Sequence, residues 1–144
     1  MKNNLKVEIV KWIDDHTQLK NIREQVFIQE QKVTPELEWD GMDEKAMHFL
    51  VFKDNEAIGC ARALVIKNYM QLGRMAVLKK YRGIGVGSAL LEKAIVTAKL
   101  KQLSSIHISA QCNTINFYVK FGFEVMGDTY LDAEILHCDM TLEF

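Results

Sequence analysis

The sequence is poor in the residues that mark extracellular or membrane proteins. It has three cysteines in 144 residues, Cys60, Cys112 and Cys138, at spacings that fit neither a disulfide framework nor a zinc site. We therefore expect a protein of the reducing cytoplasm that holds no metal. No hydrophobic run approaches the ~20 residues needed to span a bilayer, and the polar N-terminus does not resemble a signal peptide.

An excess of charge of one sign is also lacking. The 18 Lys and Arg residues nearly balance the 19 Asp and Glu residues, for a net charge of −1. No overall field therefore favours nucleic acid or a membrane as a partner. Proline occurs once, at Pro35, and the chain shows no repeat, linker or low-complexity tract. We expect one domain spanning residues 1–144, long enough to bury a core.

Hydrophobic periodicity predicts seven strands and four helices. The strands are expected at residues 6–12, 46–53, 57–66, 71–77, 105–110, 123–126 and 135–142. The helices are expected after Asp14-Asp15, at Thr34-Pro35-Glu36, after Gly87 and from Asn113 or Thr114 to about Phe121. This order, β-α-α-β-β-β-α-β-α-β-β, predicts an α/β (α+β) fold with a mixed sheet, helices on both faces and an antiparallel meander over residues 46–77.

The most informative stretch, residues 71–91, combines a strand, a basic connector, alternating glycines and a helix. Its basic residues and glycines are Lys79, Lys80, Arg82, Gly83, Gly85 and Gly87. Glycine lets the backbone approach a ligand, and the N–H groups of a first helical turn attract anions. A P-loop is excluded because no lysine follows these glycines, and the dinucleotide fingerprint fails at Ser88. The stretch predicts a phosphate site, and a ligand-free glycine-rich connection is the alternative.

Residues 82–87, Arg-Gly-Ile-Gly-Val-Gly, resemble the R/Q-x-x-G-x-G/A pyrophosphate loop of the GNAT N-acetyltransferases. The expected element order is also that of the GNAT fold, in which the strands at 71–77 and 105–110 run parallel and splay apart around acetyl-CoA. Two further segments resemble the ElaA-like or YjcF-like bacterial branch of that family. They are R-x-x-V-F-x-x-E-Q, beginning at Arg23, and D/E-x-G-I-x-H, which spans residues 132–137 with Glu134 in place of glycine.

The resemblance implies acetyl-CoA as co-substrate, with CoA as product. It implies that the following residues bind it: Met75, Ala76, Val77, Arg82, Gly83, Ile84, Gly85, Val86, Gly87, Ser88, Gln111, Asn113 and Tyr118. Residues 111–123 resemble the family segment N-x-x-A-x-x-F-Y-x-K-x-G-F, which implies that Tyr118 is the general acid. A phenol of pKa ~10 can protonate a departing thiolate. Gln111 stands at the usual asparagine position, so either Gln111 or Asn113 reaches the carrier.

Three side chains are candidate general bases: Glu30, His48 and His137. A histidine can take up a proton near neutral pH. The structural alternative is that Glu30 is a solvated carboxylate and that both histidines are hydrogen-bonded strand residues. With these three, Gln31, Asp43, Arg74 and Asp132 are candidates for binding the acceptor.

Residues 30–44 are rich in carboxylates. Arg74 lies in an apolar strand, where burying an unpaired charge is costly, and we expect it to pair with Glu30 or Glu38. If the acidic stretch rims the cleft, it favours a cationic acceptor such as a polyamine, an aminoglycoside-like sugar or a lysine side chain.

These features predict an N-acetyltransferase that transfers the acetyl group of acetyl-CoA by direct attack of a primary amine, on a small molecule or a lysine. The alternative is a non-catalytic module of the same fold that binds acyl-CoA as a sensor or contacts a partner protein. A homodimer formed by sheet extension is compatible with this fold, although no feature of the sequence requires it.

Overall fold

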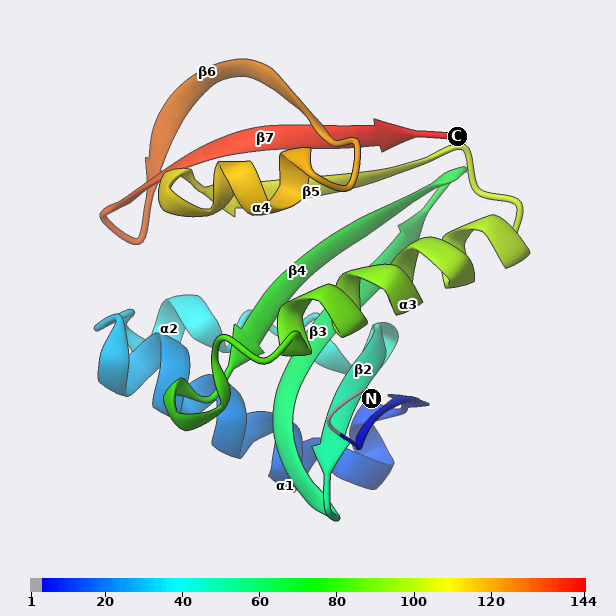
Figure 1. Ribbon diagram of the computed structural model, residues 1–144. Helices are drawn as coiled ribbons and strands as arrows, with labels where there is room; N and C mark the ends of the chain where they lie inside the picture. Colours follow the sequence, from blue (N-terminus) through cyan, green and yellow to red (C-terminus); the bar gives the residue numbers. More distant parts are fainter. Residues whose placement is uncertain (1–3) are drawn as a thin grey trace.

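The computed structural model describes residues 4–144, whose strands form one seven-stranded sheet in the order β1-β2-β3-β4-β5-β7-β6 (Figure 1). The strands are β1 (Leu5–Val10), β2 (Met47–Lys53), β3 (Glu56–Ile66), β4 (Tyr69–Val77), β5 (Ser105–Gln111), β6 (Glu124–Asp132) and β7 (Ile135–Glu143). Neighbouring strands are antiparallel except β4 and β5, which are parallel. The predicted mixed sheet and its antiparallel meander are confirmed.

The α-helices are α1 (Trp12–Arg23), α2 (Pro35–Glu38), α3 (Val86–Leu100) and α4 (Ile115–Val119). Helix α1 continues directly into a π-helical segment, η1 (Glu24–Glu30), and three single turns complete the chain: η2 (Asp43–Lys45), η3 (Lys79–Tyr81) and η4 (Cys112–Thr114). This order confirms the predicted element order. Within residues 4–144, no helix has the length and apolar character required to cross a membrane.

Two hydrophobic clusters lie on opposite faces of the sheet. Successive side chains of a strand point to opposite faces. In β2, Phe49 and Val51 pack in the cluster that contains Leu90 of α3, whereas Leu50 packs in the cluster that contains Leu19 of α1. Helices therefore cover both faces, as predicted.

The start of the first helix differs from the prediction. We expected a strand as far as Trp12 and a helix cap at Asp14-Asp15, but β1 ends at Val10 and Trp12 is the first residue of α1. Asp15 instead marks a kink, with φ −128° and ψ 19° inside the helix. The alternation of apolar and polar residues in β1 continues by chance as far as Trp12, the first residue of α1, which explains the wrong boundary.

The hairpin between β6 and β7 also differs from the prediction, which placed a loop over residues 127–134. Strand β6 continues to Asp132, with an irregularity in its register between Met126 and Tyr130. The chain then turns at Ala133 and Glu134, whose φ angles are 52° and 61°. Glu134 thus adopts the left-handed conformation that glycine would adopt without strain at the same position of the bacterial branch.

Strands β4 and β5 pair only over part of their length. Their register runs from Tyr69 opposite Ser105 to Leu72 opposite Ile108 and then ends. In the adjoining β3–β4 pair, Arg62 faces Gly73 and Cys60 faces Ala76, so two residues, 74 and 75, face a single residue of β3. Such a bulge bends its strand and leaves backbone groups unpaired. The parallel strands therefore diverge at the bulge, as the predicted splay requires.

Candidate active site

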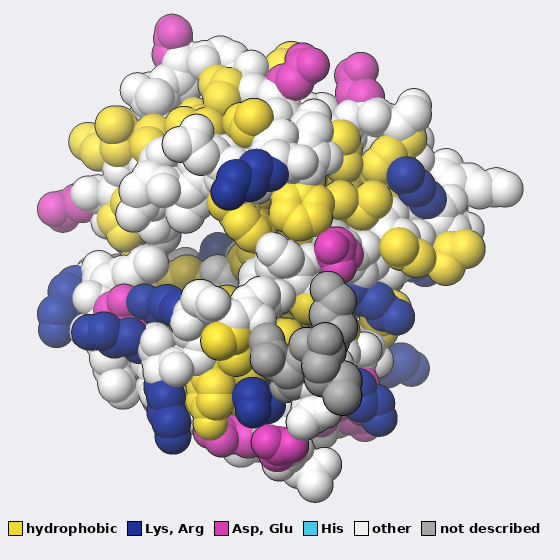
Figure 2. Space-filling model, in the orientation of Figure 1, with side chains coloured by type: hydrophobic (Ala, Val, Ile, Leu, Met, Phe, Trp, Pro, Cys, Tyr) yellow, Lys and Arg dark blue, Asp and Glu magenta, His cyan; other side chains and the backbone are white. Residues whose placement is uncertain are grey.

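The diverging ends of β4 and β5 open into a cleft of about 670 Å³. Figure 2 shows a hollow between the upper and lower halves of the molecule, with Lys and Arg side chains gathered along its lower side. The cleft brings together most of the predicted site residues: Glu30, Gln31, Arg74, Met75, Ala76, Val77, Arg82, Gly87, Gln111, Asn113, Tyr118, Asp132 and His137.

The glycine loop contributes mainly through its backbone. Gly83 and Gly85 have φ angles of 83° and 93°, which side-chain-bearing residues rarely adopt, and Gly85 immediately precedes α3. Gly87 lines the cleft, and a Cβ there would lie 3.4 Å from the ring of Phe117. The other predicted loop residues, Gly83, Ile84, Gly85, Val86 and Ser88, flank the cleft without lining it. The loop thus places the first turn of α3, with its free N–H groups, beside the cleft.

Arg82 links the glycine loop to the opposite wall. Its Nε donates to the carbonyl oxygen of Val77 at 3.0 Å, and its Nη1 and Nη2 each donate to a carboxylate oxygen of Glu30 at 2.7 Å. Hydrogen bonding from Arg82 lowers the pKa of Glu30. A carboxylate stabilised in this way is a weaker base, so the geometry does not favour Glu30 as the general base.

A second bridge lies beside the first. Gln31, the residue after Glu30, accepts a hydrogen bond of 2.8 Å from the amide of Gln111 at the end of β5. The end of η1 therefore contacts β5 through Gln31 and the glycine loop through Glu30. Gln111, rather than Asn113, makes this contact.

Tyr118 of α4 lines the cleft. It is 9% exposed, and its ring packs edge-on against Phe117 and Phe123. Its hydroxyl group donates to the thioether sulfur of Met75 at 3.6 Å, and a thioether is a weak acceptor. Burial raises the pKa of Tyr118 to about 12. The phenol is therefore protonated at neutral pH, and its proton is held by a partner that is easily replaced.

His137 of β7 lines the same cleft. Its Nδ1 lies 2.6 Å from the carbonyl oxygen of Ile135. Because a carbonyl oxygen only accepts, Nδ1 carries the proton, and Nε2 of the neutral ring is an acceptor. Within residues 4–144, Nε2 has no hydrogen-bond partner. The ring of Tyr130 stacks beside His137, with centroids 6.1 Å apart, and fixes the orientation of the imidazole.

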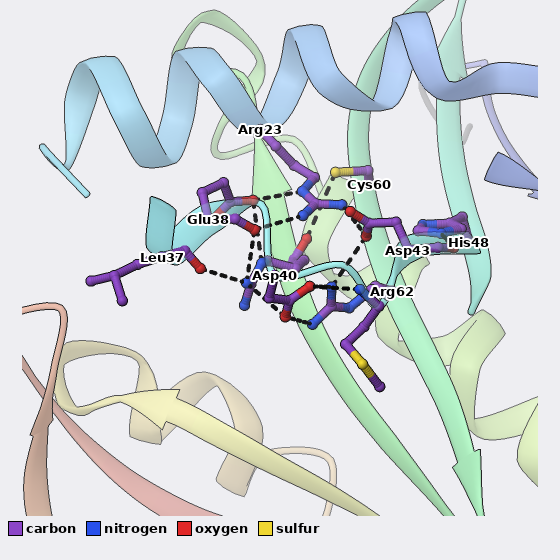
Figure 3. A network of polar contacts seen from close by, with 10 residues as sticks. Arg23, Leu37, Glu38, Asp40, Asp43, His48, Cys60 and Arg62 are labelled. Carbon is purple, nitrogen blue, oxygen red and sulfur yellow. Dashed lines mark hydrogen bonds and ion pairs between the residues drawn. The ribbon is translucent and has the colours of Figure 1, made fainter. Parts of the chain in front are cut away.

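The acidic stretch and three arginines form a closed ring of ion pairs beside the cleft (Figure 3). Each arginine contacts two carboxylates, and each carboxylate contacts two arginines. The contacts are Arg23–Glu38 at 2.6 Å, Glu38–Arg74 at 3.2 Å, Arg74–Asp40 at 3.2 Å, Asp40–Arg62 at 2.9 Å, Arg62–Asp43 at 3.1 Å and Asp43–Arg23 at 2.6 Å. Hence the predicted Arg74–Glu38 pair is confirmed, and Glu30 pairs with Arg82 instead.

Residues 13–144 match the family model described as "Acetyltransferase (GNAT) domain". The chain belongs to the GNAT acetyltransferase family. Two Bacillus subtilis (strain 168) proteins are similar to it over most of their length. "Uncharacterized protein YyaT" is 34% identical over 90% of this chain and 89% of its own length. "Uncharacterized N-acetyltransferase YjcF" is 33% identical over 83% of this chain and 86% of its own length.

Among solved structures, Escherichia coli ElaA superposes on this GNAT chain with a TM-score of 0.85, at 26% identity, over 96% of this chain and 99% of that one. These matches confirm the predicted family and its small bacterial branch. They also confirm the predicted enzyme class, an acetyltransferase that uses acetyl-CoA as co-substrate.

Two predicted site residues of this acetyltransferase lie away from the cleft. His48 is 1% exposed, its Nε2 lies 2.9 Å from the carbonyl oxygen of Asp43, and its ring packs on Trp12. Burial lowers the pKa of His48. Asp43 is itself held in the ring of ion pairs. The side chains of β2 alternate between the two faces of the sheet, so His48 lies on the face that α1 covers and not in the opening beyond β4. We therefore interpret His48 and Asp43 as structural residues.

The ring of ion pairs is graded from a buried side to a more exposed side. The side chains of Arg23 and Glu38 are 1% and 3% exposed, whereas those of Arg74 and Asp40 are 24% and 31% exposed. Burial raises the pKa of Glu38, an effect that Arg74 and Arg23 oppose. Burial would also raise the pKa of Asp40, but its hydrogen bonds from Arg62 and the Met42 N–H outweigh burial and lower that pKa to about 2.

Sequence reasoning missed several residues of this GNAT cleft. Leu37, Arg62 and Leu64 line it, as do Phe27 and Ser109. One signal was available, because Arg62 is an arginine inside an apolar strand, the same argument that identified Arg74. Leucine gives no such signal, since an exposed leucine in a short helix reads as ordinary surface.

Proposed function

We propose that this protein is an N-acetyltransferase in which a bound primary amine attacks acetyl-CoA directly, with Tyr118 as general acid and His137 as general base. One observation carries the proposal. Tyr118 of α4 and His137 of β7 line a single cleft. Tyr118 is a protonated phenol, and His137 is an imidazole whose Nε2 has no hydrogen-bond partner within residues 4–144.

The glycine loop and the two strand ends suit the carrier. The first turn of α3 and the basic residues Lys79 and Lys80 would hold the diphosphate. Met75 and Val77 would hold the pantetheine arm, because β4 pairs with β5 only as far as Leu72, so the backbone of these later residues has no partner in β5. Gln111 and Asn113 would contact the arm from β5 and η4.

The proton transfers follow from the two side chains. His137 accepts a proton from the ammonium form of the substrate, which frees the nitrogen lone pair to form the C–N bond with the acetyl carbon. As the C–S bond breaks, Tyr118 donates its proton to the sulfur, the resulting phenolate takes the remaining extra proton from the new amide nitrogen, and His137 releases its proton to solvent. The Michaelis complex replaces the weak Tyr118–Met75 contact with a contact to the thioester sulfur, which makes the proton available where negative charge develops.

The test measures thiol release from acetyl-CoA with a panel of amines. We expect Tyr118→Phe and His137→Gln each to lower kcat by roughly 10²- to 10⁴-fold, the usual range for loss of a general acid or base. Tyr81→Phe and His16→Gln are matched controls, because neither side chain lines the cleft. Unchanged turnover in either active-site variant removes that residue from the mechanism. Stabilisation by CoA with no thiol release from any amine indicates a non-catalytic acyl-CoA-binding module.

A further inference from the structure

Three carboxylates of the acidic stretch are engaged by arginines and are not available to a substrate. Glu38, Asp40 and Asp43 each contact two arginines, so three negative charges meet three positive charges. A set that is neutral and mutually hydrogen-bonded exerts little attraction on a further cation. Glu38, Asp40 and Asp43 therefore give the cleft little attraction for a polycation.

Little other negative charge faces the cleft. Glu30 is paired with Arg82 through two hydrogen bonds of 2.7 Å. Asp132, at the end of β6, is the one cleft-lining carboxylate within residues 4–144 that has no ion pair. One free carboxylate matches one ammonium group, whereas each additional ammonium of a polyamine would lose water in the cleft without gaining a partner.

Hydrophobic side chains form much of the wall on the side of α2 and the β6–β7 hairpin. They are Phe27, Val33, Leu37, Leu64, Ala133 and Ile135. Leu37 is 53% exposed although it lies beside the cleft, and Figure 3 shows its side chain pointing away from the ring of ion pairs. Its carbonyl oxygen accepts a hydrogen bond of 3.2 Å from Arg74, so the ring fixes the position of this leucine.

We infer that the acceptor is a small monoamine with an apolar body, such as an alkylamine or arylalkylamine. The inference rests on the proposed function, because it assigns the substrate of the same cleft. The amine end lies at His137 and Asp132, and the apolar body lies against Leu37 and Leu64. Polyamines and amino sugars carry several charges that this wall leaves unpaired.

The experiment compares 2-phenylethylamine and hexylamine with spermidine and a lysine-containing peptide. Thiol release gives kcat/KM for each amine, and calorimetry gives the affinity of each amine for the CoA-loaded protein. We expect kcat/KM for the two apolar amines to exceed that for spermidine and for the peptide by about tenfold or more, because a difference of one buried methylene is already worth about tenfold. Higher kcat/KM and affinity for spermidine or for the peptide would overturn the inference.

Leu37→Glu tests the wall itself, and the exposure of Leu37 makes the variant compatible with folding. We expect it to lower kcat/KM for 2-phenylethylamine about tenfold and to raise the relative rate with spermidine. Leu131→Glu is the matched control, since Leu131 is 71% exposed on the opposite face of the hairpin and should change neither rate. An unaltered preference in Leu37→Glu also overturns the inference. If no amine is acetylated but calorimetry shows the apolar amines binding more tightly than spermidine, the proposed function fails and the assignment of the cleft stands.

Discussion

Replacing Arg23 with methionine tests the energetic importance of the ring of ion pairs. The Arg23 side chain is 1% exposed, donates to Glu38 and Asp43 at 2.6 Å each, and lies 5.7 Å from the ring centroid of Trp12 and 5.0 Å from that of Trp39. Methionine keeps the unbranched stem and removes the charge. Glu38 and Asp43 then each lose one of their two arginine partners while remaining buried.

The expected cost follows from that burial. Removing one partner of a buried ion pair typically costs about 3–5 kcal/mol, because the remaining charge is uncompensated. Arg74 and Arg62 still contact the two carboxylates, so we expect the lower end of this range, about 3 kcal/mol. For a chain of this size each kcal/mol lowers Tm by roughly 3–4 °C, so Arg23→Met should melt about 10 °C lower.

Urea titration and thermal melting measure the loss, and Arg82→Met provides the control. Arg82 makes hydrogen bonds to Glu30 that are nearly as short, 2.7 Å, but the two side chains are 40% and 36% exposed. Exposed pairs contribute about 0–1 kcal/mol. The reasoning is refuted if the two variants lose equal stability, because distance rather than burial would then set the cost, or if Arg23→Met loses less than about 1 kcal/mol.

Three further changes have defined outcomes. Glu134→Gly should raise stability by roughly 1 kcal/mol in urea titration, since Glu134 has a φ of 61°, whereas the β6–β7 turn variant Ala133→Val should lower it. Gly85→Ala should lose roughly 1–2 kcal/mol and weaken CoA binding in a thermal-shift assay, because its φ is 93°. The pKa of Asp40 is lowered from 3.8 to about 2, so the ionised carboxylate stabilises the fold above pH 4. The free energy of unfolding should fall by about 1–2 kcal/mol as the pH falls from 4 through 2, and Asp40→Asn should lack this pH dependence.

The parts of the fold that the sequence predicts are those encoded locally. The stripe of Leu19, Ile22 and Val26 specifies a helix whatever surrounds it, and the glycines before α3 specify a left-handed turn at a helix start. The order of such elements was sufficient to predict the mixed sheet, and the resemblance to the GNAT family predicted the place where it opens. Tyr118 and Arg82 followed because each lies within a contiguous motif.

The remaining features depend on contacts between distant segments. In the ring of ion pairs, Arg74 contacts Asp40 from 34 residues away, and only the folded sheet brings them together. The tautomer of His137 depends on a carbonyl oxygen two residues away, whose direction is set by the hairpin turn. The turn itself uses Ala133 and Glu134 in a conformation that their residue types disfavour. An arginine inside an apolar strand indicates that its charge needs a partner, but the sequence does not indicate which carboxylate that partner is.

Arg74 connects the stability of this acetyltransferase to its chemistry. Its φ of 50° places a non-glycine residue in the left-handed region, which costs roughly 1–2 kcal/mol. Its Nη2 donates to the carbonyl oxygens of Leu37 and Glu38 and to the carboxylate of Asp40, and its Nε lies 3.2 Å from Glu38 Oε2 without the alignment of a hydrogen bond.

These contacts offset the strain and hold the bulge in place. Because the next residue, Met75, contacts the hydroxyl group of Tyr118, the position of the bulge also sets where that hydroxyl group meets the cleft. The ring of ion pairs therefore fixes the backbone of β4 at the point where it leaves β5, beside the cleft, and its carboxylates are held by arginines of the fold.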